Sequence, residues 1–219
     1  MLFIHGFPEF WYSWRHQIRE FSQDFFVVAI DLRGYGESDK PIGIHNYTVD
    51  NMAEDVKQLL EALDKKQVIL VGHDWGGVIA WNFAAKYPNL VEKLIVLNSP
   101  HPIVFRKVMK KSWKQYFTSF YMFFFNLPLL PELLILSNDL RIFDDIFSSA
   151  DGHPICTEED IEAYKYVFCK PQALTGPLNY YRALIRKYSN RQVNYQIKVQ
   201  TLIIWGNFIL NVRKSLILN

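Results

Sequence analysis

The chain contains only two cysteines, Cys156 and Cys169, among its 219 residues. Two cysteines do not make the disulfide framework of a small secreted domain, and neither has the neighbouring ligands of a zinc site. We therefore expect two free thiols, which is compatible with a reducing compartment. The sequence predicts no metal site.

The chain also lacks an excess of charge of either sign, because 24 basic and 22 acidic residues leave a formal net charge of +2. This balance argues against a nucleic-acid partner, which selects for a strongly basic surface. Half of the residues are hydrophobic and 16% are aromatic, which favours a globular domain over disorder. The length suits one domain with a sizeable core.

No leader is recognisable at the N-terminus, since the apolar run of residues 1–4 is short and carries no basic residue. A longer uncharged stretch covers residues 115–131. Pro128 and Pro131 interrupt it and Glu132 follows it, which argues against a membrane span. We interpret this stretch as a buried lid segment, with a lipid-facing lid surface as the alternative.

An aspartate flanked by glycines follows an apolar strand in the middle of the chain. Residues 68–77 read V-I-L-V-G-H-D-W-G-G, which predicts a strand over 68–71, a sharp turn and a helix over 77–87. Asp74 has the position of the nucleophile in a nucleophile elbow, with Gly72 two residues before it and Gly76 two residues after. A side chain at either glycine would clash in so tight a turn. The alternative is an ordinary strand–turn–helix with a solvated aspartate.

A second turn opens the chain, where a predicted strand over residues 2–4 runs into H-G-F-P-E. Such a turn supplies one backbone N–H of an oxyanion hole, here from Phe7, and the residue after the nucleophile, Trp75, supplies the other. The remaining residues of this turn are expected to be structural: His5, Gly6 and Pro8.

Strands and helices alternate along the first hundred residues. The patterns predict strands over 26–30 and 94–97 and helices over 14–21 and 48–63, and a strand returns at 199–206. Alternation of this kind indicates an α/β fold with a mostly parallel sheet. We expect three parts: an α/β core over 1–102, a helical cap over 103–195, and a returning core strand with a divergent tail over 196–219.

Three segments carry a family resemblance: H-G-F-P-E-F-W-Y-S-W-R from residue 5, D-L-R-G-Y-G-E-S from residue 31 and G-H-D-W-G-G from residue 72. Together they resemble the epoxide hydrolases of the α/β-hydrolase family, especially the membrane-anchored epoxide hydrolase-4-like branch. The resemblance runs from residue 2 to about residue 206. It implies an α/β-hydrolase fold, incomplete here because the family's first two strands and any membrane anchor are absent from this chain.

The resemblance also implies a site and a chemistry. Asp74 would attack a small apolar epoxide and form an ester, while the cap residues Tyr121 and Tyr181 would hydrogen-bond to the epoxide oxygen. Tyr180 adjoins Tyr181 and is the alternative to it. No cofactor is implied, and the location would be the cytoplasm or the membrane surface of the endoplasmic reticulum.

The chain departs from the family in the groups that hydrolyse the ester. The family's acid follows a W-G pair, but here Trp205 and Gly206 are followed by N-F-I-L-N, and no histidine follows His153. Asn98 lies where some relatives carry their acid, and an amide cannot replace it. We also do not expect any other histidine to act as the base: His5, His16, His45, His73, His101 and His153.

We therefore expect ring opening without efficient ester hydrolysis. A haloalkane dehalogenase is one alternative, although Phe7 offers no side-chain donor for a halide. A non-catalytic α/β-hydrolase-fold protein that binds a lipid or a partner is the other. Because both edges of the sheet would lack neighbours, we also expect marginal stability.

Overall fold

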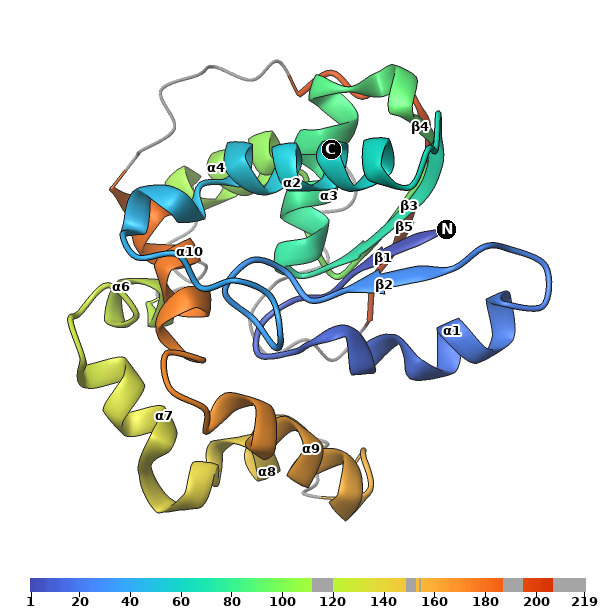
Figure 1. The fold of residues 1–219 in the computed structure, drawn as a ribbon. Helices are drawn as coiled ribbons and strands as arrows, with labels where there is room; N and C mark the ends of the chain where they lie inside the picture. Colours follow the sequence, from blue (N-terminus) through green and yellow to red (C-terminus); the bar gives the residue numbers. More distant parts are fainter. Residues whose placement is uncertain (112–119, 149–152, 154, 187–194, 207–219) are drawn as a thin grey trace.

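The computed structural model describes residues 1–111, 120–148, 153, 155–186 and 195–206 (Figure 1). In these residues one parallel sheet has the strand order β2-β1-β3-β4-β5. The predicted α/β fold with a parallel sheet is confirmed. The strands are β1 (Leu2–Ile4), β2 (Val28–Ile30), β3 (Val68–His73), β4 (Val91–Leu97) and β5 (Gln200–Ile204).

Strand β4 begins three residues earlier than the sequence pattern predicts. Val91 pairs with Val68, but Glu92 and Lys93 follow it and are exposed. These charged side chains hide the start of the strand from a search for apolar runs. Backbone pairing with β3 nevertheless extends the strand through them.

Helices cover both faces of the sheet (Figure 1). Helix α1 (Arg15–Phe21) lies on one face, where Phe3, Trp14 and Val71 form a small apolar cluster. Helices α2 (Val49–Ala62) and α3 (Trp75–Lys86) lie on the other face. Short 3-10 helices occur at Trp11–Trp14, Ile44–Tyr47 and Pro88–Leu90.

The sequence predicts the start of helix α2 correctly but places the start of helix α3 too late. Helix α2 begins after Thr48, whose side chain accepts a hydrogen bond from the N–H of Asn51 at 3.2 Å, as an N-cap does. Helix α3 begins at Trp75, two residues before the predicted start. The elbow therefore leads from strand to helix with no intervening loop.

The described residues between β4 and β5 contain helices and no strand. These are α4 (Pro102–Lys111), α6 (Tyr121–Phe124), α7 (Leu130–Leu140), α8 (Ile142–Ile146), α9 (Glu158–Phe168) and α10 (Thr175–Ile185). Figure 1 shows α7, α8 and α9 as a lobe beside the sheet, with α10 leading back to the core. Both cysteines in this region are free thiols.

The prediction of a buried lid over 115–131 is wrong for most of its described part. Residues 115–119 lie outside the described residues, and residues 127–130 are exposed. Tyr121, Met122 and Phe125 pack partly against the core, because α6 is a single turn that presents only one side to it. None of the described helices has the length and apolar character needed to span a membrane.

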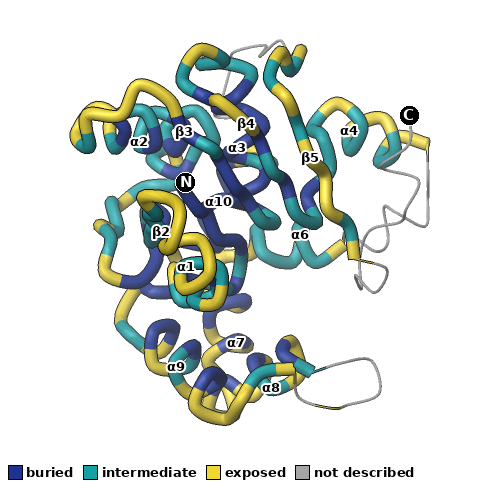
Figure 2. The backbone as a smooth tube through the Cα atoms, turned by 90° about the vertical axis from the view of Figure 1, so that its right-hand side faces the viewer, coloured by how far each residue is buried: buried dark blue, intermediate teal, exposed yellow. Residues whose placement is uncertain are grey.

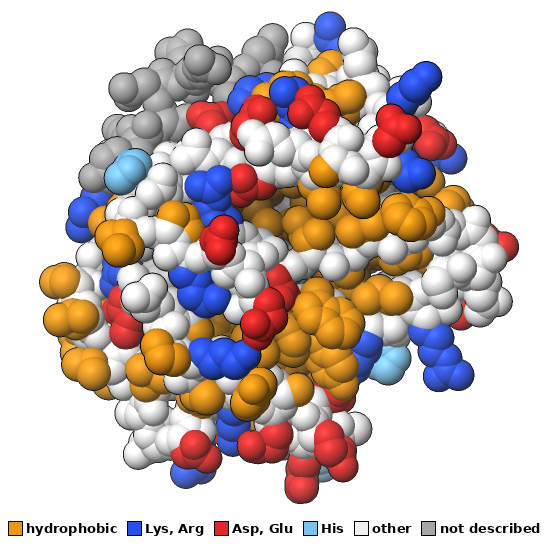
Figure 3. Space-filling model, in the orientation of Figure 1, with side chains coloured by type: hydrophobic (Ala, Val, Ile, Leu, Met, Phe, Trp, Pro, Cys, Tyr) orange, Lys and Arg blue, Asp and Glu red, His pale blue; other side chains and the backbone are white. Residues whose placement is uncertain are grey.

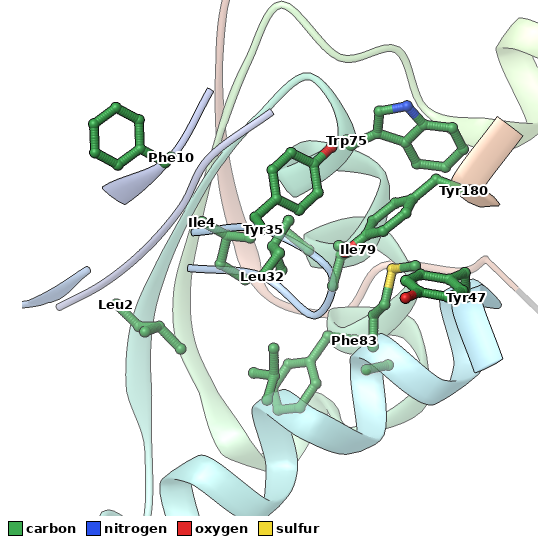
Figure 4. Close-up of a cluster of buried hydrophobic side chains, with 14 of the residues drawn as sticks. Leu2, Ile4, Phe10, Leu32, Tyr35, Tyr47, Trp75, Ile79, Phe83 and Tyr180 are labelled. Carbon is green, nitrogen blue, oxygen red and sulfur yellow. The ribbon is translucent and has the colours of Figure 1, made fainter. Parts of the chain in front are cut away.

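Burial falls from the middle of the sheet to its edge (Figure 2). Strand β1 and most of β3 are buried, whereas Leu202, Ile203 and Ile204 of β5 are exposed. The main apolar cluster extends from α2 and α3 into the cap through Tyr35, Trp75 and Tyr180, whose rings lie together in Figure 4. Aromatic packing therefore joins the helical segment to the sheet.

Candidate active site

Asp74 lies on the turn between β3 and α3 with a backbone conformation of φ 49° and ψ −116°. A positive φ is costly for a residue with a side chain, so surrounding contacts must hold it. The Asp74 N–H donates to the Leu97 carbonyl at 3.3 Å, and the Asp74 carbonyl accepts from the Val78 N–H at 3.0 Å. These two bonds fix the aspartate at the carboxyl edge of the sheet.

The turn has no room for side chains at its glycines. A Cβ at Gly76 would lie 2.1 Å from the carbonyl oxygen of Ile4, and one at Gly72 would lie 2.4 Å from that of Gly76. A Cβ at Gly6 would lie 2.5 Å from the Cβ of Asp74. Close approach of backbone to backbone therefore brings the two predicted turns into contact.

The Asp74 carboxylate accepts hydrogen bonds from both backbone groups that the sequence predicts for an oxyanion hole. The Phe7 N–H donates to Asp74 Oδ1 at 2.9 Å, and the Trp75 backbone N–H also donates to this carboxylate. Burial raises the pKa of Asp74 above its ordinary value, and the charge of His73 and the two N–H bonds offset this only in part. The carboxylate is thus oriented by two backbone donors and only partly exposed.

His5 and Pro8 belong to the frame of the first turn. The buried His5 ring bonds to the Gly6 carbonyl through Nδ1 at 2.8 Å, and its Nε2 accepts from the Leu32 N–H at 3.1 Å. These partners assign a proton to Nδ1, and burial lowers the pKa of His5. Pro8 follows a cis peptide bond from Phe7.

Glu9 and His73 form an ion pair that the sequence patterns do not reveal. Glu9 Oε2 lies 3.1 Å from His73 Nδ1 and also accepts from the Gly6 N–H at 2.8 Å. Burial favours the neutral forms, but the mutual attraction dominates and lowers the pKa of Glu9 to about 2. The same pair raises the pKa of His73 to about 9. The only sequence signal is that Glu9 ends the first motif and His73 precedes the nucleophile.

Tyr121 of α6 and Tyr181 of α10 lie together beside the elbow. Their ring centroids are 6.0 Å apart, and the Tyr181 ring lies 5.0 Å from Trp75 and 5.7 Å from Phe7. Burial, with a smaller contribution from the charge of Asp74, raises the pKa of both phenols well above the ordinary value. Both phenols are therefore neutral donors near the carboxylate.

Tyr180, the neighbour of Tyr181, has a different environment. Its buried hydroxyl donates to the Arg33 carbonyl at 2.8 Å. Its ring packs against Tyr35, Tyr47 and Trp75. The structure therefore brings Tyr181, and not the Tyr180 hydroxyl, toward Asp74.

Asn98 and His101, neither of which is expected from the sequence to be catalytic, form hydrogen bonds with the backbone. Asn98 Oδ1 accepts from the Gly206 N–H at 2.8 Å. His101 Nε2 bonds to the Tyr195 carbonyl at 3.0 Å, while its Nδ1 accepts from the Ile103 N–H at 3.3 Å. His16, His45 and His153 are exposed. Residues 207–211, which follow the W-G pair, lie outside the described residues.

In the part of the chain that the structure describes, no group of three or more His, Cys, Asp or Glu side chains is arranged to hold a metal ion. The site consists of one carboxylate, two backbone donors, two phenols and an aromatic wall. These groups suit attack on a small electrophile with stabilisation of a developing oxygen charge.

Comparison with known families agrees with this geometry. Residues 1–208 match the family described as the alpha/beta hydrolase fold. The chain belongs to the α/β-hydrolase family. Its curated relatives and structural neighbours are mainly epoxide hydrolases, which confirms the resemblance stated from the three motifs.

Among these relatives, epoxide hydrolase 4 of Homo sapiens is 46% identical over 211 residues, which cover 94% of this chain and 58% of the relative. Epoxide hydrolase 1 of Caenorhabditis elegans is 43% identical, with 94% and 52% covered. The chain thus spans little more than half the length of these two relatives. The epoxide hydrolase of Bacillus megaterium, solved with an inhibitor, superposes with a TM-score of 0.83 at 34% identity, covering 99% of this chain and 79% of that one.

Proposed function

We propose that this chain opens an epoxide ring by forming an ester on Asp74. The observation that carries this proposal is the 2.9 Å hydrogen bond from the Phe7 N–H to Asp74 Oδ1. With Oδ1 held in this way, Oδ2 is the oxygen left to attack. An ionised carboxylate needs no base for this step.

In the proposed step, Asp74 Oδ2 forms a bond to an epoxide carbon while the ring C–O bond breaks. The electron pair of that bond goes to the ring oxygen, which accepts hydrogen bonds from Tyr121 and Tyr181 and takes a proton from one of them. Solvent then reprotonates the phenolate. The raised pKa of each phenol supports this role, because both are neutral donors at neutral pH.

The site favours an apolar substrate. The rings of Phe7, Phe125 and Tyr181 pack edge to face against one another, with centroids 4.9 to 5.7 Å apart. They form an aromatic wall at the site. The Phe7 side chain provides no donor for a leaving halide, so the site supports an epoxide better than a haloalkane.

We place the division between core and cap near residues 102 and 195.

We also propose that these 219 residues hydrolyse the ester slowly. Hydrolysis needs a base to deprotonate water, and the three histidines that are not exposed, His5, His73 and His101, are engaged. Both ring nitrogens of His5 and of His101 have backbone partners. The raised pKa of His73, about 9, makes it a cation at neutral pH rather than a base.

Intact-mass spectrometry tests both parts. The chain is incubated with styrene oxide as the probe, and its mass is expected to increase by one epoxide, with fragmentation placing the adduct on Asp74. The Asp74→Asn variant is the control and should show no increase. An unmodified parent, or an adduct that persists in Asp74→Asn, would overturn the ring-opening proposal, and sustained diol production would overturn slow hydrolysis.

A further inference from the structure

In the segment from residue 120 to residue 136, the residues most exposed to solvent are apolar. It contains helix α6, the following turn and the first part of α7. Every exposed residue in it has an apolar side chain, including Leu129 at 71%, Leu133 at 65% and Phe120 at 60% exposure. We name these nine residues the apolar cap face: Phe120, Phe123, Leu127, Pro128, Leu129, Leu130, Leu133, Leu134 and Leu136.

The single acidic residue of this segment points away from the apolar cap face. Glu132 is buried and pairs with Arg182, with Nη1 to Oε1 at 2.8 Å and Nη2 to Oε2 at 3.0 Å. The outward surface from 120 to 136 therefore carries no formal charge. Scattered exposed apolar residues are common on proteins, but a contiguous apolar surface of this kind marks an interaction site.

Polar backbone groups beneath this surface also have partners inside the protein. Arg182 Nε donates to the Phe125 carbonyl at 3.1 Å, and Nη2 donates to the Leu127 carbonyl at 2.8 Å. The Asn126 side chain donates to the Met122 carbonyl at 2.8 Å. Satisfied carbonyls matter because apolar surroundings offer no substitute for water.

We propose that the apolar cap face docks onto the surface of a lipid bilayer. A protein partner normally makes hydrogen bonds across the contact surface as well as apolar contacts, whereas no exposed polar side chain interrupts residues 120–136, and exposed polar residues return only at Ser137, Asn138 and Asp139. An amphipathic surface that inserts leucine and phenylalanine at the acyl boundary needs no such bonds. Figure 3 shows orange side chains gathered on the flank where α6 and α7 lie in Figure 1.

The position of the apolar cap face relates it to the site. Phe120 and Phe123 lie on the face, while Tyr121 and Phe125 pack partly against the core beside Tyr181. One short helix thus separates the docked surface from the phenols. An apolar epoxide dissolved in the bilayer would then have only this short helix between it and the site. This consequence rests on the proposed function, but the docking itself does not.

Vesicle co-sedimentation of the full chain tests the proposal with phosphatidylcholine vesicles. The parent is expected to sediment with the vesicles and to remain bound at high salt, since apolar insertion is not screened. Replacement of Leu129, Leu133 and Leu134 by Ser should lower the partition coefficient by about tenfold or more. The matched control replaces three exposed apolar residues elsewhere by Ser: Phe26, Ile42 and Ile155. The control variant should bind as the parent does.

Circular dichroism and thermal melting establish that both triple variants are folded. Asp74→Asn should also bind as the parent does, so that failure of the chemistry and failure of docking give different results. Absence of parent binding, or equal binding by the Leu129, Leu133 and Leu134 variant, would overturn the proposal. So would binding that needs anionic lipid and disappears at high salt, which would indicate the basic helix α4. Self-association through these leucines without vesicle binding would point to a second copy instead.

Discussion

Arg182 and Glu132 form a buried two-point ion pair between α10 and α7. The same guanidinium bonds to the Phe125 and Leu127 carbonyls at the end of α6. Because Arg182 follows Tyr181 directly and these carbonyls follow Tyr121 closely, one side chain holds the segments of both phenols. Only the planar fork of arginine makes so many directed bonds at once.

We expect Glu132→Gln to lower the free energy of unfolding by about 3 kcal/mol, because it leaves a buried guanidinium without its counter-charge. Urea denaturation measures this change. Glu37→Gln is the control, because Glu37 and Lys170 form a shorter pair of 2.6 Å while Glu37 is 84% exposed. That variant should match the parent, and equal losses in the two variants would contradict the role of burial.

Removal of single hydroxyl groups should distinguish the roles of Tyr121 and Tyr181 from that of Tyr180. Tyr121→Phe and Tyr181→Phe should each slow adduct formation about 100-fold, because each removes one donor to the ring oxygen. Tyr180→Phe is the matched control. It should keep the parent rate while losing about 1 kcal/mol of stability with its bond to Arg33. A slow Tyr180→Phe variant beside a fast Tyr181→Phe variant would reverse the assignment.

Adduct formation should fall as the solution is acidified through the pKa of Asp74. The reactive form is the carboxylate, and burial raises the pKa of this group above its ordinary 3.8. The decline should therefore begin at a higher pH than for an exposed aspartate. Rates of mass increase across a pH series measure it, and a rate that stays constant down to the ordinary value would disagree with the buried geometry.

Stability should depend on pH through Glu9 and His73. The pKa of His73 rises from 6.5 to about 9, so its contribution is complete below the lower value and is lost as pH rises through the higher one. The pKa of Glu9 falls from 4.5 to about 2, so its contribution is present above 4.5 and is lost as pH falls through about 2. The ion pair therefore contributes most to stability between pH 4.5 and pH 6.5, above the ordinary pKa of Glu9 and below that of His73.

Glu9→Gln tests this pair by unfolding in urea across the same pH range. We expect a loss of about 2 kcal/mol near pH 6 and a smaller decline toward pH 9 than in the parent. The Gln side chain still offers an oxygen to the Gly6 N–H, so the difference reports the charge pair. Parallel stability curves for parent and variant would show that the pair does not titrate in this way.

The exposed edge of β5 should limit solubility. In the residues that the structure describes, β5 is the last strand of the sheet and its Leu202 and Ile204 are exposed, an arrangement that favours strand addition by another chain. We expect the parent to melt at low temperature and to scatter light on heating, and Leu202→Lys to reduce the scattering. A clear, highly stable monomer would contradict the expected marginal stability.

Local constraints made much of the fold and site predictable from sequence. Gly72 and Gly76 lie where one backbone segment closely approaches another, so only glycine fits there. Their spacing around Asp74 could therefore be recognised in the sequence. Alternating apolar runs likewise identified the parallel sheet. The start of β4 escaped prediction because Val91 and Lys93 pair with β3 through their backbones, and backbone pairing does not depend on side-chain polarity.

Sequence alone predicted the elbow and the turn that meets it, because each depends on residues close together in the chain, whereas Tyr121 and Tyr181 were expected from the family resemblance. Tertiary structure decided that Glu9 pairs with His73, that Arg182 binds Glu132, and that the leucines of α7 face outward. These outcomes depend on which distant segments exclude water from a side chain. A charged residue such as Glu132 has the same letter in the sequence whether it is solvated or buried beside its partner.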